Sequence, residues 1–313
     1  KGRDGGEWGL LTEMTFDLFV ATLYRMPRGK AVGLSGFSVE LATAFEKGGG
    51  VQRAIYDAIC SDLQEARIPP SWRVVVYALL VKPAPNNPEV VAQRREIALM
   101  EQAMKTVAQS VRHSAYGEVA GRLDMAQLGW IAGMSTAHVS MQLHSVISQA
   151  ARVGHALYVL YVDLSTFFPS IDRRCLRMLE LRAGLPADLL RIVDMIFGFA
   201  EAGVGGIECF YDSAGGLGGA FENDMGALMG DVASPDRAKC FVNSVLAAIQ
   251  VVVRGVRLWG SAPQTAEQLW TCLTGAAFAD DIFGCYTDIG DLQVAWSYLS
   301  TWSIIFGQEL GVK

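Results

Sequence analysis

The sequence has no clustered cysteines or histidines and no long apolar run. Its six cysteines are scattered, none of them forms a Cys-x-x-Cys pair, and its four histidines lie apart from them. This pattern disfavours a zinc site and indicates a protein that keeps its thiols reduced. The longest apolar stretch, at residues 245–253, falls far short of the roughly 20 residues that a membrane-spanning helix needs. Since no charged-then-apolar leader is visible either, we expect an intracellular protein without a membrane anchor.

Charge runs are also missing, proline is sparse, and the balance of charge is acidic. Charged residues make up 19% of the 313 residues and hydrophobic residues 51%, which argues against disorder and provides a core for one large domain or two lobes. The formal net charge of −6 lacks the basic footprint that is typical of nucleic-acid binding. Net charge hides local patches, however, and an acidic catalytic cluster lowers it. The chain begins at Lys1 rather than Met, and we expect it to be a segment of a longer protein.

Apolar runs and helical spacings alternate along the chain, which predicts an α+β or α/β protein. Runs of apolar residues predict strands at residues 73–81 and 157–163, the first followed by a loop and a return strand at residues 94–99. Apolar residues at helical spacing predict helices, among them residues 137–151, 236–253 and 297–306.

Two adjacent acids, Asp280 and Asp281, interrupt an apolar region. Residues 276–278 before them and 282–286 after them are mainly apolar, so the pattern predicts two short strands with the acids at the turn. Carboxylates among apolar residues need a partner, and Mg²⁺ prefers such oxygen ligands. Asp163, at the end of its predicted strand, offers a third carboxylate. Two Mg²⁺ ions about 4 Å apart, held by such acids, can clamp an in-line phosphoryl displacement.

A purely structural interpretation of these acids stays open. An aspartate at a strand end is often a helix cap or a turn former, and an Asp-Asp pair suits a hairpin turn without any metal. Adjacent residues of a strand point to opposite faces, so Asp280 and Asp281 need not be equal ligands. Of the two, we rank Asp280 first.

Three further features concern the binding of a nucleotide. The predicted hairpin of residues 73–99 brings Lys82 and Arg95 near one another. A lysine ammonium group together with an arginine guanidinium group, which can make two parallel hydrogen bonds, suits the binding of a triphosphate. Charged residues that guard an exposed sheet edge explain the same pattern, and from the residues alone we favour that explanation. The glycine-rich basic turn at residues 28–36 lacks the spacing of a P-loop. Phe168, one short turn beyond the predicted strand at 157–163, can wall a sugar pocket and exclude a 2′-hydroxyl by its bulk.

Eight short motifs occur in order between about Arg28 and Lys313. They are Gly29-Lys30-Ala31-Val32-Gly33-Leu34-Ser35-Gly36; Pro70-x-Trp72 followed by Lys82-Pro83; Arg95-x-Ile97-x-Leu99 with Lys105; Gln127-x-Gly129-Trp130…Gly133-x-Ser135-Thr136; Asp163-x-x-x-Phe167-Phe168-x-x-Ile171; Gly230-x-x-x-Ser234-Pro235 with Asn243; Phe278-Ala279-Asp280-Asp281; and Trp302…Gly307-x-x-Leu310-x-x-Lys313. Each motif alone is a weak signal, but their order is a strong one. The series resembles the reverse transcriptase domain of non-LTR (LINE-type) retrotransposons, which has relatives among group II intron enzymes.

The resemblance implies a right-hand polymerase fold of the α+β class with fingers and palm. Residues 1–155 would be an N-terminal extension and the fingers. Residues 156–313 would be the palm, with an excursion toward the fingers at about 183–224, and we expect the thumb to be largely missing. The implied activity is RNA-directed DNA synthesis, a two-metal nucleotidyl transfer from dNTPs to a primer 3′-hydroxyl. It implies an RNA template, a DNA primer, two Mg²⁺ ions (or Mn²⁺) and a place in the nucleus or cytoplasm of the host of a mobile element.

By position, the resemblance also assigns roles to single residues. The catalytic residues and metal ligands are Asp163, Asp280 and Asp281, with Leu164 as a further position at the metal. The nucleotide-binding residues that it implies are Lys82, Arg95, Phe168, Gly230, Ser234, Pro235 and Lys313.

Three residues depart from the pattern of the family. Met229 stands where glutamine is usual, Ser35 where aspartate is usual, and Glu96 where proline is usual. Methionine cannot make the hydrogen bonds of the amide that it replaces. Together with the acidic net charge, this motivates an alternative, a catalytically inactive relic of the palm fold or an RNA-binding scaffold. A polymerase that copies RNA into RNA is a third interpretation, which Phe168 disfavours because its bulk should block ribonucleotides.

Overall fold

A computed structural model describes residues 14–33, 35–65, 67–82, 94–120, 126–185, 190, 194, 207–213, 216–223, 225–259 and 270–312. The chain divides into two compact units, and each unit is built from two separate stretches of sequence. The first unit comprises residues 1–121 and 184–234, and the second unit comprises residues 122–183 and 235–313. Both units combine helices with strands, which confirms the predicted mixture of the two. None of the helices in the described ranges is long and apolar enough to cross a membrane.

The first unit is a mixed sheet with helices. Its helices are α2 (Phe16–Arg25), α3 (Val39–Thr43), α4 (Gly50–Gln64), η1 (Pro70–Arg73) and α5 (Gln102–Ala120). Its strands are β1 (Val74–Val81), β2 (Arg94–Leu99), β4 (Ile207–Ser213), β5 (Gly216–Leu217) and β6 (Phe221–Asn223). The strand order is β2-β1-β4-β5, with β6 paired to β4. Because β1 runs antiparallel to β2, the predicted strand and return strand are confirmed.

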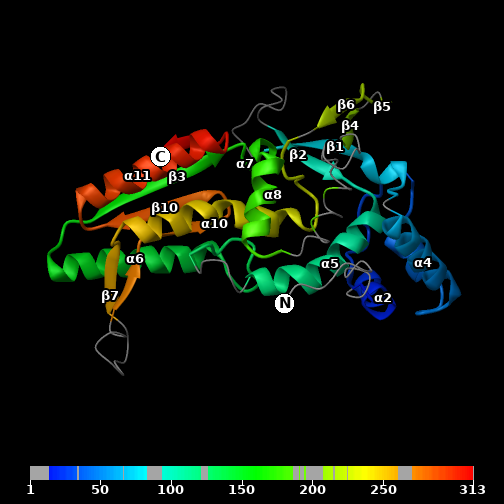
Figure 1. The fold of residues 1–313 in the computed structure, drawn as a ribbon, viewed down its shortest axis with the longest axis horizontal. Helices are drawn as coiled ribbons and strands as arrows, with labels where there is room; N and C mark the ends of the chain where they lie inside the picture. The colour runs from blue at the N-terminus through cyan, green and yellow to red at the C-terminus, as the bar shows by residue number, and fades with distance from the viewer. Residues whose placement is uncertain are drawn as a thin grey trace. The chain divides into compact units, whose positions relative to one another are not determined.

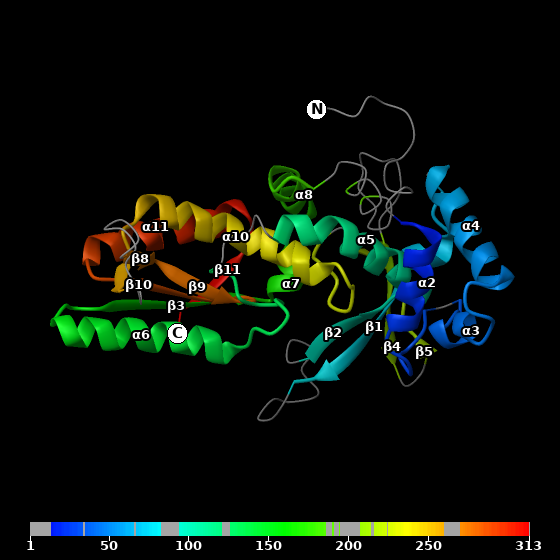
Figure 2. The same ribbon diagram turned by 90° about the horizontal axis from the view of Figure 1, so that it is seen from below.

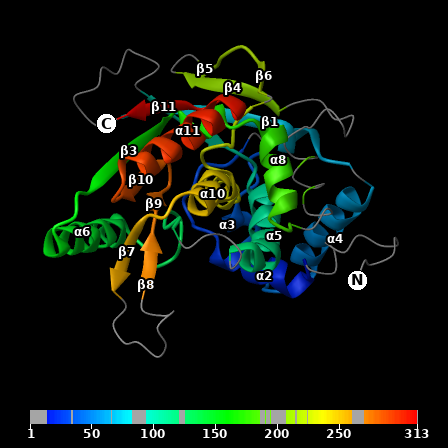
Figure 3. The same cartoon turned by 60° about the vertical axis from the view of Figure 1, so that its left-hand side comes forward.

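The second unit is built on a four-stranded antiparallel sheet in the order β11-β3-β10-β9, whose central strands β3 and β10 are labelled in Figure 1. Its strands are β3 (Tyr158–Ser165), β9 (Gly275–Phe278), β10 (Asp281–Tyr286) and β11 (Glu309–Val312). A separate two-stranded ribbon consists of β7 (Val256–Trp259) and β8 (Trp270–Leu273) (Figure 3). Its helices are α6 (Thr136–Val153), α7 (Phe167–Ser170), α8 (Arg173–Arg182), α10 (Ser234–Val252) and α11 (Ile289–Ile305).

Helices cover the two faces of the sheet of the second unit unequally. Helices α10 and α11 lie on one face, and α6 lies on the other (Figure 2). Val162 of β3 and Ile282 of β10 line a small cavity together with Leu246 of α10 and Leu299 of α11. Because side chains alternate along a strand, the residues next to Val162 and Ile282 face away from α10 and α11.

Two features of the second unit differ from the prediction. Helix α11 begins at Ile289, eight residues before the predicted start at 297. The side chain of Asp288 accepts a hydrogen bond from the amide of Gly290 and caps this earlier start. Residues 309–312 form strand β11, where no strand was predicted.

Candidate functional site

The two adjacent acids lie at a tight β-hairpin. Phe278, the last residue of β9, pairs with Asp281, the first residue of β10, so the turn consists of Ala279 and Asp280. Ala279 has a φ of 63°, in the left-handed region that an L residue enters at a cost of roughly 1–2 kcal/mol. The predicted hairpin is therefore present, with one acid in its turn and the other at the start of a strand.

The sheet brings Asp163 directly opposite Asp281. The two residues are Cα partners in the antiparallel pairing of β3 with β10. The amide of Leu164 donates to the carbonyl oxygen of Asp280 over 3.3 Å, which makes Asp163 and Asp281 a non-hydrogen-bonded pair. In such pairs the Cα atoms lie about 4.5 Å apart, and the two side chains share a face. The register thus selects Asp281, rather than Asp280, as the cross-strand partner of Asp163.

Strand β11 pairs with β3 on the side away from β10, next to the partly buried Asp163. Gly311 is the Cα partner of Asp163. A Cβ atom on Gly311 would come to 3.6 Å from the Cβ and 3.7 Å from Oδ2 of Asp163, so glycine keeps this neighbour small. Lys313, assigned to the nucleotide by resemblance, lies outside the described residues.

The donor set fits Mg²⁺ in its usual binding mode. Among the residues that the structure describes, no three His, Cys, Asp or Glu side chains gather into a complete metal cluster. Mg²⁺ usually takes only one or two protein carboxylates, and water and substrate phosphates complete its shell. Asp163 and Asp281, which share a face of the sheet, could supply two such carboxylates. Leu164 has a buried side chain, so only its backbone oxygen is suited to a metal.

Phe168 lies on α7, the short helix that follows β3, and its ring packs against other aromatic rings. Its ring centroid lies 5.6 Å from that of Trp130 in an edge-on arrangement, and 5.5 Å from that of Phe167. Phe167 is buried and contacts Phe241 of α10. Phe168 is only partly buried, so one residue of the pair anchors α7 and the other remains accessible.

Lys82 and Arg95 lie at the end of the β1–β2 hairpin where the connecting segment leaves β1 and enters β2. Arg95 is the Cα partner of Leu80, and Lys82 follows Leu80 by two residues. When the alternation of β1 is continued by one residue, Lys82 lies on the same side as Arg95, on the diagonal position about 7–8 Å away. Arg95 is exposed and Lys82 partly buried.

The loop that precedes α10 is tied to strand β2 within the first unit. The amide of Ala98 donates to the carbonyl oxygen of Met229 over 2.6 Å. Gly230 has a φ of 116°, and a Cβ there would come to 2.6 Å from the carbonyl oxygen of Ala98. The hydroxyl of Ser234 donates to Asp231 over 3.0 Å, and both side chains are buried. Burial lowers the pKa of Lys105 on α5, and the carboxylate of Asp231 opposes that shift.

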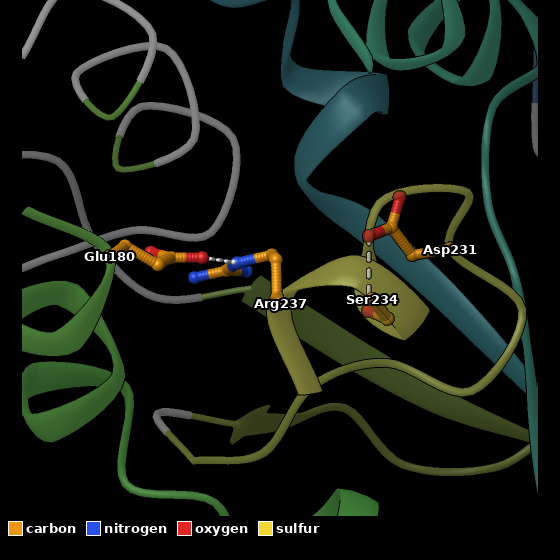
Figure 4. Close-up of polar contacts among 4 residues, drawn as sticks. All are labelled: Glu180, Asp231, Ser234 and Arg237. Carbon is orange, nitrogen blue, oxygen red and sulfur yellow. Dashed lines mark hydrogen bonds and ion pairs between the residues drawn. The ribbon is translucent and has the colours of Figure 1, made fainter. Parts of the chain in front are cut away.

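The start of α10 also carries a buried ion pair that no motif of the sequence predicted. Nε of Arg237 lies 2.7 Å from Oε1 of Glu180 on α8, and neither side chain is exposed. Figure 4 shows the two side chains pointing toward one another, and in the same view the hydroxyl of Ser234 points to Asp231. Pro235 occupies the first turn of α10, where proline is tolerated because its missing N–H has no helical partner.

Gln127 is a further polar residue that sequence reasoning passed over except as part of a motif. It is 1% exposed, and its side chain bonds to the turn that carries Asp280. Its spacing from Gly129 was the only signal in the sequence.

Fold and site together define a protein of mixed helices and strands with a carboxylate pair beside a hairpin of an antiparallel sheet. Neither a family model nor a curated protein matches the sequence. Among solved structures, the chain is similar to telomerase from Candida albicans in complex with a fragment of telomeric RNA. The TM-score is 0.49 at 10% identity, over 83% of this chain and 45% of that one.

It is also similar to apo telomerase from Candida tropicalis truncated from its C-terminal domain. The TM-score is 0.49 at 10% identity, over 87% of this chain and 60% of that one. The chain thus spans less than two thirds of either structure.

Proposed function

We propose that the chain is the fingers and palm part of an RNA-directed DNA polymerase of a mobile element, with the right-hand polymerase fold. The observation that carries the proposal is the strand register that sets Asp163 opposite Asp281, with Asp280 in the adjoining turn. Because side chains alternate along a strand, the pair lies on the sheet face opposite α10 and α11. Two carboxylates on one face suit the transfer of a nucleotidyl group, because that chemistry needs charge neutralisation and positioning more than a protein nucleophile.

In this proposal the carboxylates of Asp163 and Asp281 hold Mg²⁺, and Asp280 contributes a further carboxylate from the turn. Bound Mg²⁺ would neutralise phosphate charge and lower the pKa of the attacking hydroxyl. The chain's own residues position that hydroxyl and the incoming dNTP. The ring of Phe168, held by Trp130, would occupy the space of a 2′-hydroxyl and so select deoxyribonucleotides.

The remaining predicted residues belong to substrate binding. Lys82 and Arg95 supply a point charge and a planar fork for the triphosphate. The loop of Gly230, with Ser234 and Pro235 after it, would contact the primer–template and the incoming base. Lys313 would complete the nucleotide site.

Primer extension tests the proposal directly. The chain is incubated with an RNA template, a DNA primer, dNTPs and either Mg²⁺ or Mn²⁺, and the elongated primer is measured. We expect synthesis that Asp163→Asn and Asp281→Asn each abolish. Asp57→Asn, which removes an exposed carboxylate from α4, is the matched control and should leave synthesis intact. Synthesis that survives both substitutions at the acids would show that the assignment is wrong.

The second candidate is an RNA-binding scaffold of the same fold that does not synthesise DNA. Met229 favours it, since its carbonyl oxygen holds β2 while its side chain lacks an amide. This candidate expects binding of RNA that weakens with salt, no incorporation with either metal, and no effect of Asp163→Asn on binding.

A further inference from the structure

We infer that Gln127 is a positioning residue, whose side-chain amide holds the Ala279 turn so that Asp280 and Asp281 line up with Asp163. The inference deepens the proposed function and rests on it. All of the residues concerned belong to the second unit.

The segment that carries Gln127 is fixed to the edge of the sheet by its backbone. The amide of Ala277 on β9 donates to the carbonyl oxygen of Ala126 over 2.7 Å, and the amide of Leu128 donates to the carbonyl oxygen of Ala277 over 2.8 Å. These two bonds form a short parallel bridge between Gln127 and Ala277. These backbone bonds alone place Gln127 beside Ala277, two residues before Ala279 of the turn.

The amide of Gln127 then binds both backbone groups of the turn residue. Its Nε2 donates to the carbonyl oxygen of Ala279 over 3.1 Å, and its Oε1 accepts from the amide of Ala279 over 3.2 Å. Oε1 also accepts from the amide of Gly129 over 2.9 Å. Only a side chain with a donor and an acceptor at this reach can make all three bonds, and among the standard residues glutamine fits best. The side chain is 1% exposed, so water does not compete for these groups.

Ala279 needs such support because its conformation is unfavourable. A left-handed φ is unfavourable for an alanine, and the hydrogen bonds from Gln127 to both backbone groups of Ala279 offset that cost. Loss of these bonds should therefore let the turn change its shape. If the turn relaxes, the next carbonyl, that of Asp280, loses its alignment with the amide of Leu164, and the pairing of Asp281 with Asp163 is disturbed.

Gly129 completes the support from the same segment. A Cβ atom at this position would overlap the backbone nitrogen of Ala279, so a side chain there would push the turn away. Gln127 and Gly129 thus both position Ala279, Gln127 by hydrogen bonding to its backbone and Gly129 by having no side chain that would displace it. The Gln-x-Gly pair of the sequence therefore supports the turn that carries the carboxylates.

The test measures metal affinity as well as synthesis, with Mn²⁺ as the probe and electron paramagnetic resonance as the readout. Gln127→Met keeps the volume of the side chain and removes all three bonds. We expect its Mn²⁺ dissociation constant to rise by about 10-fold, as is typical when a residue that orients a metal ligand is lost. Gln52→Met is the matched control, because Gln52 is a fully buried glutamine of the first unit whose amide also bonds to backbone groups. It should lower the thermal midpoint similarly and leave Mn²⁺ affinity unchanged.

A second substitution separates holding the turn from filling the core. Glycine adopts φ > 0 without the cost that alanine bears, so Ala279→Gly added to Gln127→Met should restore part of the Mn²⁺ affinity. Should Gln127→Met fail to fold, Gln127→Asn keeps an amide at shorter reach and is expected to show the same loss and the same rescue.

The outcomes distinguish this inference from the proposed function. If the wild-type chain neither binds Mn²⁺ nor extends a primer, the proposed function fails and the inference falls with it. If the wild-type chain binds Mn²⁺ and Gln127→Met binds it equally well, the inference alone is overturned. It is overturned too if affinity is lost and Ala279→Gly restores none of it, because the turn is then not what Gln127 holds.

Discussion

Replacing Arg237 with methionine should destabilise the second unit by about 3–5 kcal/mol, because the carboxylate of Glu180 is then left charged in the core. The two side chains are fully buried, and Nε of Arg237 lies 2.7 Å from Oε1 of Glu180. Glu180→Gln should cost a similar amount from the other side. Since native stabilities are typically about 5–15 kcal/mol, either change consumes a large part of the total.

The expected loss of stability depends on the burial of the ion pair rather than on the distance between its atoms. Arg67 and Glu65 also approach to 2.7 Å, but their side chains are 64% and 54% exposed. Exposed pairs are worth about 0–1 kcal/mol, so Arg67→Met is the matched control and should change little. Replacing both buried partners, in Glu180→Leu with Arg237→Met, should recover most of the loss, since it removes the charges together.

Urea unfolding followed by circular dichroism measures these differences. A loss of about 3–5 kcal/mol moves the midpoint by about 1–2 M when the slope is about 2–3 kcal/mol per molar urea. A double-mutant cycle over the wild type, Arg237→Met, Glu180→Leu and their combination then isolates the coupling between the two side chains. The reasoning is refuted if Arg237→Met shifts the midpoint no more than Arg67→Met, or if the double variant is less stable than both single ones.

Three further outcomes are expected. Gly230→Ala should lower the free energy of unfolding by about 1–3 kcal/mol, because φ is 116° and the new Cβ would lie 2.6 Å from a backbone oxygen of β2. The control Gly48→Ala, at a φ of 73° with no atom within 4 Å of the new Cβ, should lower it by only about 1 kcal/mol. Thermal unfolding of the two variants measures the difference. Burial raises the pKa of the thiols of Cys240 and Cys285 from 9.0 to about 12. Between these values the unfolded chain loses protons that the folded chain keeps, so the free energy of unfolding should fall as pH rises from about 9 to about 12; urea titrations that stay flat over this window would contradict the burial of the thiols. Phe168→Ala should raise kcat/KM for ribonucleotides relative to deoxyribonucleotides, and an unchanged ratio would separate this ring from the sugar.

The strands that carry the acids were predictable because their sequences are compact apolar runs with a clear turn between them. Residues 276–278 and 282–286 leave few alternatives to a hairpin around Asp280 and Asp281. Which of the two acids pairs with Asp163 was not predictable, because it depends on the register of β10 against β3. A shift of one residue would exchange them, and the ranking of Asp280 first as a metal ligand stays a prediction.

Other features could not be predicted because local sequence patterns do not mark them, and several depend on residues far away in the chain. Residues 309–312 contain Glu, Leu, Gly and Val without a strand pattern, and they become a strand only by pairing with β3. The first turns of α11 carry apolar residues on several sides, as Ile289, Leu292 and Val294 show, so no one-sided periodicity marks its start. Gln127 bonds to a residue 152 positions away, and nothing local indicates its partner.

The division of the chain into two interleaved units limits how such a protein can be rearranged in evolution. The two stretches of each unit are separated by a stretch of the other unit, with crossings near residues 121, 183 and 234. A single recombination breakpoint between residues 122 and 234 would therefore leave at least one unit with halves from two parents. Exchange of either unit as an intact piece requires three breakpoints, one at each crossing, so the two stretches of a unit are expected to be inherited together rather than separately.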